Sequence, residues 1–136
     1  MKRTFPFLLL GDLLILLVFV LIGQADHQTL NRSNPLVGAL PNFLPLASAW
    51  LVMALVLRAY PRAALSLRAF LARSALAWLL AAPLGLFLRM LLLQRGGVPL
   101  PFLLVTLSIG GLMLLGWRVL YWVGVLRKQT KPTAAL

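Results

Sequence analysis

The acidic residue Asp12 lies within an apolar run, in a chain of 136 residues that has only two acidic residues. A carboxylate at the centre of a membrane helix costs about 2.5–3.5 kcal/mol on insertion scales, so it needs a partner or a function. Asp12 can form a structural ion pair, act as a proton or cation site, or extend unpaired to the membrane interface. Helix geometry places Arg118 and Arg73 at similar depths, and their long side chains can bridge the remaining difference. Both are therefore candidate partners.

Two other features can hold a ligand. Trp50 and Trp78 are expected near the middle of the membrane, where they can line a slot for a quinone, carotenoid or lipid, or simply pack inside the bundle. His27, the only histidine, can ligate a pigment or haem within a larger complex. One histidine, two acidic residues and no cysteine provide no catalytic triad, phosphate loop or metal site. We expect no enzymatic activity, metal or cofactor.

The elements that must position these residues are four apolar segments. Hydrophobic residues make up 62% of the chain and charged residues 11%, and each segment is long enough to cross a bilayer as a helix. The sequence predicts an all-α, integral membrane four-helix bundle as one domain over residues 1–124, followed by a basic cytoplasmic tail over 125–136. The expected spans are about 5–23, 42–60, 69–93 and 101–124. The length of the first span and its Asp12 favour a retained helix over a signal peptide.

The positive charges predict the orientation. Most lysines and arginines fall on one side if the N-terminus is cytoplasmic: Lys2, Arg3, Arg58, Arg62, Arg68, Arg73, Arg118, Arg127, Lys128 and Lys131. Those left outside are Arg32, Arg89 and Arg95. This positive-inside bias places both termini in the cytoplasm. The net charge of +11 then indicates contact with anionic lipid headgroups rather than nucleic acid. An aromatic belt is expected at the inner interface from Tyr60, Trp117, Tyr121 and Trp122.

Small residues predict where the helices pack. Ala77, Ala81 and Gly85 follow one another at intervals of four in the third span, and Gly110 and Gly111 lie in the fourth. Small residues at such positions let membrane helices approach closely. We therefore expect a helix–helix seam on each of these spans.

Several short motifs carry a family resemblance: Leu10-Gly11-Asp12-Leu13-Leu14, Leu21-Ile22-Gly23, His27, Trp50, Arg89, Pro101-Phe102 and Gly116-Trp117-Arg118. Together they resemble a bacterial and plastid membrane-protein family known as domain of unknown function 3054, over roughly residues 8–123. The resemblance implies a four-helix membrane protein and assigns no catalytic or binding residue. Gln24 stands where similar sequences are expected to have a basic residue.

Two functions of different classes remain open. The first is a non-enzymatic accessory, scaffold or assembly subunit of a larger membrane complex, which has a membrane-protein partner or forms a homo-oligomer. The second is a small proton-coupled transporter, or a protein that binds an apolar ligand, and either would use Asp12 as its functional residue. Either would reside in a bacterial inner membrane or an equivalent bioenergetic membrane.

Overall fold

The chain is all-helical in the parts that the computed structural model describes, which are residues 4–26, 33–61, 65–93 and 100–130. The first three spans are α1 (Thr4–Asp26), α2 (Pro35–Val56) and α3 (Leu67–Leu93). The fourth span contains two π-helical turns, η1 and η2, and its order is α4 (Leu100–Val105), η1 (Thr106–Gly110), α5 (Gly111–Tyr121), η2 (Trp122–Leu126) and α6 (Arg127–Thr130). Four segments are long and apolar enough to cross a membrane: Phe5–Ala25, Pro35–Val56, Leu67–Leu93 and Leu100–Leu126. The all-α prediction is confirmed.

Helix α2 differs most from its predicted bounds. It begins at Pro35 rather than near residue 42, because Asn34 caps it: the Asn34 side chain accepts a hydrogen bond from the backbone N–H of Val37 at 3.2 Å. Proline in the first turn adds to this start, since its missing N–H would have no helical partner there. The fourth span also continues as helix to Thr130, into the region expected to be a tail.

The end of α2 is set by a turn in the left-handed conformation. Arg58 has a φ of 56°, which is unusual for a residue other than glycine. The N–H of Ala59 bonds to the carbonyl of Ala54 at 2.8 Å, and that of Arg58 to Leu55 at 3.3 Å. These two bonds form a Schellman motif, which terminates the helix and reverses the chain. The turn therefore directs the residues after Arg58 back toward the bundle.

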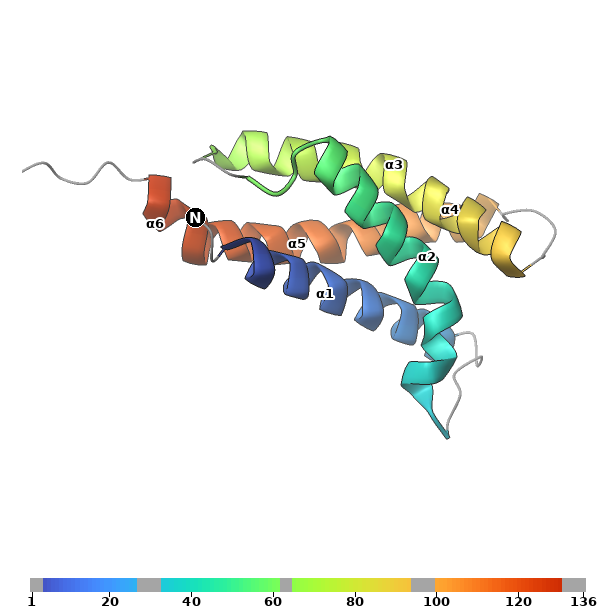
Figure 1. Ribbon diagram of the computed structural model, residues 1–136. Helices are drawn as coiled ribbons and strands as arrows, with labels where there is room; N and C mark the ends of the chain where they lie inside the picture. Colours follow the sequence, from blue (N-terminus) through green and yellow to red (C-terminus); the bar gives the residue numbers. More distant parts are fainter. Residues whose placement is uncertain (1–3, 27–32, 62–64, 94–99, 131–136) are drawn as a thin grey trace, which may run out of the picture.

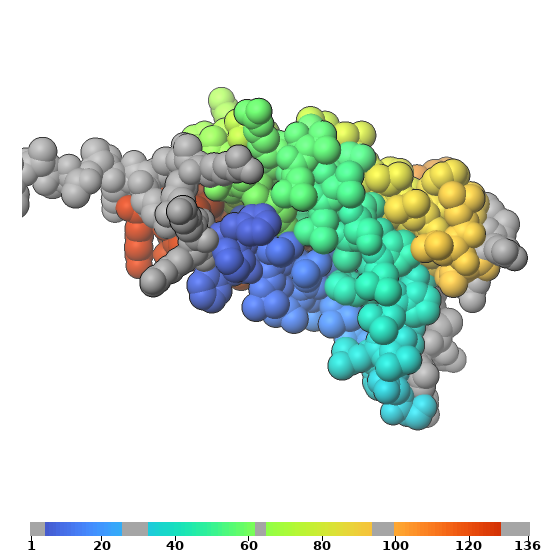
Figure 2. Space-filling model, in the orientation of Figure 1, coloured from blue at the N-terminus to red at the C-terminus, as the bar shows by residue number. Residues whose placement is uncertain are grey.

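The helices run up and down, each antiparallel to the one before it (Figure 1). Helix α1 packs against α2 and α5, and α3 packs against the same two helices. The start of α1 and the short helix α6 consequently lie at the same end of the bundle (Figure 1). The first turns of α2 extend away from the other helices, as the space-filling view also shows (Figure 2).

The predicted seam of α3 is buried against α2. Ala77, Ala81 and Gly85 are all buried. A Cβ atom placed on Gly85 would lie 3.0 Å from the backbone Cα of Leu46 and 3.5 Å from Cβ of Ala49, so the contact has no room for a larger side chain. The outer surface is apolar in contrast: Leu112 and Leu120 of α5 are 74% and 70% exposed.

Candidate functional site

Asp12 and Arg118 form an ion pair inside the bundle, and both side chains are fully buried. Nη2 of Arg118 lies 2.6 Å from Oδ2 of Asp12, and Nε lies 3.2 Å from Oδ1. The guanidinium group thus contacts both carboxylate oxygens, which is the strongest geometry for such a pair. Of the two candidate arginines, the structure places Arg118 against Asp12.

Close approach of α1 and α5 brings these two residues together. Leu8, Asp12, Leu16 and Val20 form a buried row on α1 at intervals of four, which keeps them on similar faces of successive turns. The indole of Trp117 occupies the space where a Cβ of Gly11 would lie. A glycine before Asp12 and a tryptophan before Arg118 therefore fit one another, and the next residue of each helix completes the ion pair.

Arg73 occupies a different place from the one expected. Its Nη1 donates to the backbone carbonyl of Arg58 at 3.4 Å, outside the ion pair. Successive residues of a helix point about 100° apart, so its neighbour Ser74 is the residue of α3 that faces the interior. Arg73 lies at a depth that would allow pairing with Asp12, but its side chain leaves α3 on a different face from the one that lines the site.

Tyr60 and Trp50 complete the surroundings of the carboxylate. The hydroxyl of Tyr60 donates to Oδ2 of Asp12 at 2.6 Å, and the indole N–H of Trp50 lies 3.3 Å from the same oxygen. The Trp50 N–H also lies 3.1 Å from the Tyr60 oxygen. Asp12 consequently accepts hydrogen bonds from three side chains, which compensate for the water it has lost.

Burial first, and the charge of Asp12 second, raise the pKa of the Tyr60 phenol above its ordinary value. Tyr60 lies beyond the end of α2, in the chain reversal that follows Arg58. Its hydroxyl therefore keeps its proton and remains a donor to the carboxylate throughout the physiological pH range.

The third guanidinium nitrogen of Arg118, Nη1, also has acceptors within the protein. Nη1 donates to the carbonyl of Ala59 at 2.7 Å and to Oγ of Ser74 at 2.9 Å. Ser74 in turn donates to the carbonyl of Phe70 at 2.7 Å, one turn earlier in α3. Removing one partner of a buried, hydrogen-bonded ion pair typically costs about 3–5 kcal/mol, because the other charge is left without compensation.

Of the four aromatic residues expected in an interfacial belt, the two tyrosines lie in the interior, which corrects that expectation for them alone. Tyr60 and Tyr121 are buried, and the ring of Trp117 packs beside that of Tyr121 at a tilt of 54°, with centroids 5.7 Å apart. The indole N–H of Trp122 donates to the carbonyl of Leu65 at 3.1 Å. Trp117 and Trp122 are only half-buried, so both remain compatible with a place at the interface.

Tyr60, Phe70, Ser74 and the carbonyl of Ala59 are site components that sequence reasoning missed. Ser74 carried a usable signal, because it is a polar residue in an apolar span next to a candidate partner of Asp12. Phe70 and Ala59 carried none, since one contributes a ring face and the other a backbone oxygen.

Trp50 and Trp78 lie side by side, with ring centroids 6.3 Å apart. Trp78 donates to the carbonyl of Leu107 in η1 at 3.1 Å, and its ring packs on Gly110 and Gly111. The π-helical turn alters the α-helical bonding pattern in this region, and Trp78 provides a donor to one of its carbonyls. Both indoles are buried and bonded to protein atoms, which favours packing over an apolar-ligand slot.

A second polar contact lies in another part of the bundle. Nε of Arg89 in α3 donates to Oδ1 of Asn42 in α2, and its guanidinium lies 5.5 Å from the ring centroid of Phe102 in α4. Arg89 therefore links three helices and takes no part in the Asp12 site.

Two further predictions concern ligands. His27 lies outside the residues that the structure describes, so the pigment or haem prediction has no structural counterpart. Among the described residues, no group of three or more His, Cys, Asp or Glu side chains could hold a metal ion.

The site unites motifs from both ends of the chain, Gly11-Asp12 and Trp117-Arg118. A comparison with curated proteins finds no match, and a comparison with solved structures finds none either. The family model described as Protein of unknown function (DUF3054) matches residues 9–121, which is most of the chain and includes both motifs. The protein belongs to this family.

Proposed function

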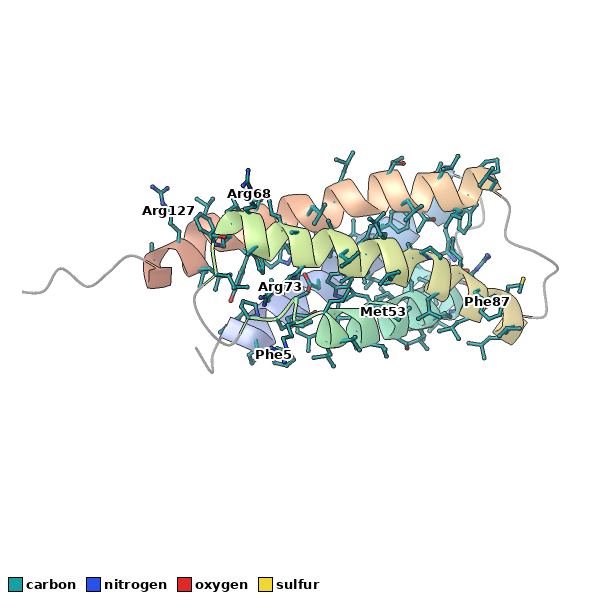
Figure 3. The ribbon with its side chains drawn as sticks, turned by 90° about the horizontal axis from the view of Figure 1, so that it is seen from above. Phe5, Met53, Arg68, Arg73, Phe87 and Arg127 are labelled. Carbon is teal, nitrogen blue, oxygen red and sulfur yellow. The ribbon has the colours of Figure 1, made fainter. Side chains whose placement is uncertain are left out.

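We propose that the protein is an integral membrane protein with both termini in the cytoplasm, in a bacterial inner membrane or an equivalent bioenergetic membrane. Four long apolar helices with exposed leucine side chains support insertion. Arg68 and Arg127 point outward at the end of the bundle where α6 lies (Figure 3). The positive-inside bias makes this the cytoplasmic end, where the arginines can meet anionic lipid headgroups.

Reporter fusions at Met1 and Leu136 test this topology. Cytoplasmic signals from both fusions are expected, because an even number of spans returns the chain to the face on which it started. A periplasmic signal from either fusion would contradict the four-span topology.

Within the membrane, we propose that the protein is a non-enzymatic accessory or scaffold subunit of a larger complex. The observation that carries this proposal is that both carboxylate oxygens of Asp12 accept hydrogen bonds from protein side chains. The carboxylate has no exposed surface, and its contacts are Arg118, Tyr60 and Trp50. A proton or cation exchange site has to open to solvent and release its partner during each cycle. The observed geometry instead favours a structural role.

The outer face of the fourth span supports docking to a partner. In the most apolar stretch of this span only 22% is buried inside the bundle, against 28% to 39% for the corresponding stretches of the other three spans. Gly116 lies on this face, and a Cβ placed there would have no neighbour within 4 Å. An exposed glycine between Leu112 and Leu120 lets a second helix approach closely. The occupant is a different membrane protein or a second copy of this chain.

Extraction from native membranes in a mild detergent tests the scaffold role. We expect a particle larger than a single 15.0 kDa chain, with partner polypeptides or further copies of the chain in stoichiometric amounts. The variant Gly116→Leu should reduce this assembly without lowering the melting temperature, because the glycine is open to the outside. A monomer that exchanges protons for a cation in liposomes would instead support the transporter.

A further inference from the structure

The guanidinium group of Arg118 is surrounded by three aromatic rings. Its Cζ lies 4.9 Å from the ring centroid of Trp50, 4.9 Å from that of Tyr60 and 5.2 Å from that of Phe70. Each distance is within the range at which a cation is attracted to the negative face of a ring. Three rings around one cation make an aromatic cage of the type that recognises organic cations.

All three nitrogens of the guanidinium donate hydrogen bonds to protein acceptors. Asp12 accepts from Nε and Nη2, while the carbonyl of Ala59 and the hydroxyl of Ser74 accept from Nη1. Because the hydroxyl of Ser74 donates its hydrogen bond to the carbonyl of Phe70, its oxygen presents a lone pair to the guanidinium. The arrangement of acceptors matches the planar, forked set of donors in a guanidinium.

The walls of the cage are held in place by bonds that do not involve Arg118. Trp50, Tyr60 and Asp12 are bonded to one another. Ser74 is fixed to its own helix, and the Schellman turn at Arg58 positions the segment that carries Tyr60. These contacts would remain if the Arg118 side chain were shortened, so the cage should keep its shape.

We propose that Asp12, Trp50, Tyr60, Phe70 and Ser74 form a guanidinium-selective cation site whose resident ligand is the Arg118 side chain. Shortening this side chain opens the site to a free guanidinium ion. The wild-type protein does not take the free ion, because its own arginine fills the cage. This selectivity goes beyond the scaffold role, since it does not depend on whether the bundle serves a larger complex.

An ammonium ion is a poor substitute for this ligand. It is a compact and strongly hydrated charge whose donors are not coplanar. It could contact Asp12, but it could not also span the separation to Ala59 and Ser74 in the plane that the guanidinium uses. The variant Arg118→Lys should therefore melt well below the wild type, although it keeps the positive charge.

Arg118→Ala in lipid nanodiscs tests the site directly. Methylguanidinium at millimolar concentrations, which reproduces the end of the arginine side chain, should raise the melting temperature of this variant in step with the logarithm of its concentration. Methylammonium at the same concentrations should not. The melting temperatures of the wild type and of the double variant Asp12→Asn/Arg118→Ala should not rise, because the first has a filled cage and the second lacks the carboxylate.

Three results would overturn the proposal. The first is an equal response of Arg118→Ala to methylguanidinium and methylammonium. The second is failure of Arg118→Ala to bind methylguanidinium, including failure to recover a folded protein when the ion is present during extraction. The third is an Arg118→Lys variant that melts with the wild type, which tests selectivity even if the alanine variant does not fold. Arg73→Ala serves as the matched control and should show no response to either ion, because Arg73 lies outside the cage.

Discussion

The hydroxyl of Tyr60 lies 2.6 Å from Oδ2 of Asp12, although 48 residues separate them in the chain. The contact depends on the left-handed turn at Arg58, which returns the chain to the bundle after α2 ends. It gives the buried carboxylate a neutral donor, which is carried by a segment that the turn positions. The way in which α2 ends thus determines whether Tyr60 can donate a hydrogen bond to the buried carboxylate of Asp12.

Tyr60→Phe should flatten the dependence of stability on alkaline pH. Burial raises the pKa of Tyr60 in the folded state above its unfolded value, which is about 10. Above that pH, the unfolded state loses this proton while the folded state keeps it, so folding stability falls as pH rises. The fall attributable to Tyr60 should approach about 1.4 kcal/mol per pH unit.

Denaturation of both proteins in detergent between pH 8 and about pH 11 measures the difference. Tyr60→Phe should also lose roughly 1–3 kcal/mol at neutral pH, because a buried carboxylate oxygen loses a donor. Parallel pH profiles for the wild type and the variant would contradict the raised pKa.

Gly85→Leu should lower the melting temperature strongly, whereas Gly116→Leu should leave it nearly unchanged. At Gly85 the nearest atom to a new Cβ is the backbone of Leu46 at 3.0 Å, which cannot turn aside as a side chain can. At Gly116 a new Cβ meets nothing within 4 Å. Both changes bring the same gain in helix propensity, so their comparison isolates packing. Equal melting temperatures would place the α3 seam against lipid.

The four spans could be predicted because their length and apolar composition are properties of continuous segments. Asp12 could likewise be recognised from one residue, since an acid in such a segment needs compensation. Its partner could not be chosen from depth alone. Arg73 and Arg118 lie at compatible depths, and only the rotation of α3 turns Ser74 rather than Arg73 toward the site.

The end of α2 could not be predicted for a different reason. The left-handed position of a Schellman motif is usually a glycine, and here it is Arg58. Without that signal, the sequence predicts a span that ends at Tyr60 and places this residue at the membrane interface. The true end of the helix at Val56 turns Tyr60 inward instead.

Arg58→Gly should be tolerated and Arg58→Val should be destabilising. A residue other than glycine pays about 1–2 kcal/mol for the left-handed conformation, and a β-branched side chain pays more. Glycine removes this cost, although it loses more entropy on folding, so its net effect should lie within about 1 kcal/mol of the wild type. Melting temperatures of the two variants provide the comparison. Equal destabilisation by both would show that the arginine side chain, rather than the backbone conformation, matters at this turn.

Asp12→Asn should destabilise the protein by about 3–5 kcal/mol, because it leaves the buried guanidinium of Arg118 without a counter-charge. The amide keeps the shape of the carboxylate and can still accept from Tyr60 through its oxygen, so the loss reports mainly on charge. The double variant Asp12→Asn/Arg118→Met should recover much of this loss, since it removes both charges from the interior. Arg73→Met is the matched control and should cost less than about 1 kcal/mol, because Arg73 has no ion-pair role in the site.

Thermal melts of these variants in detergent also separate the two functional hypotheses. A proton-coupled Asp12 would tolerate the change to asparagine, because the amide mimics the protonated acid, and only pH-dependent transport would disappear. A structural Asp12 cannot tolerate it unless Arg118 changes as well. The bidentate contact and the complete burial of both side chains lead us to expect the destabilised single variant and the recovered double variant. A stable, well-folded Asp12→Asn protein would refute the structural role and favour transport.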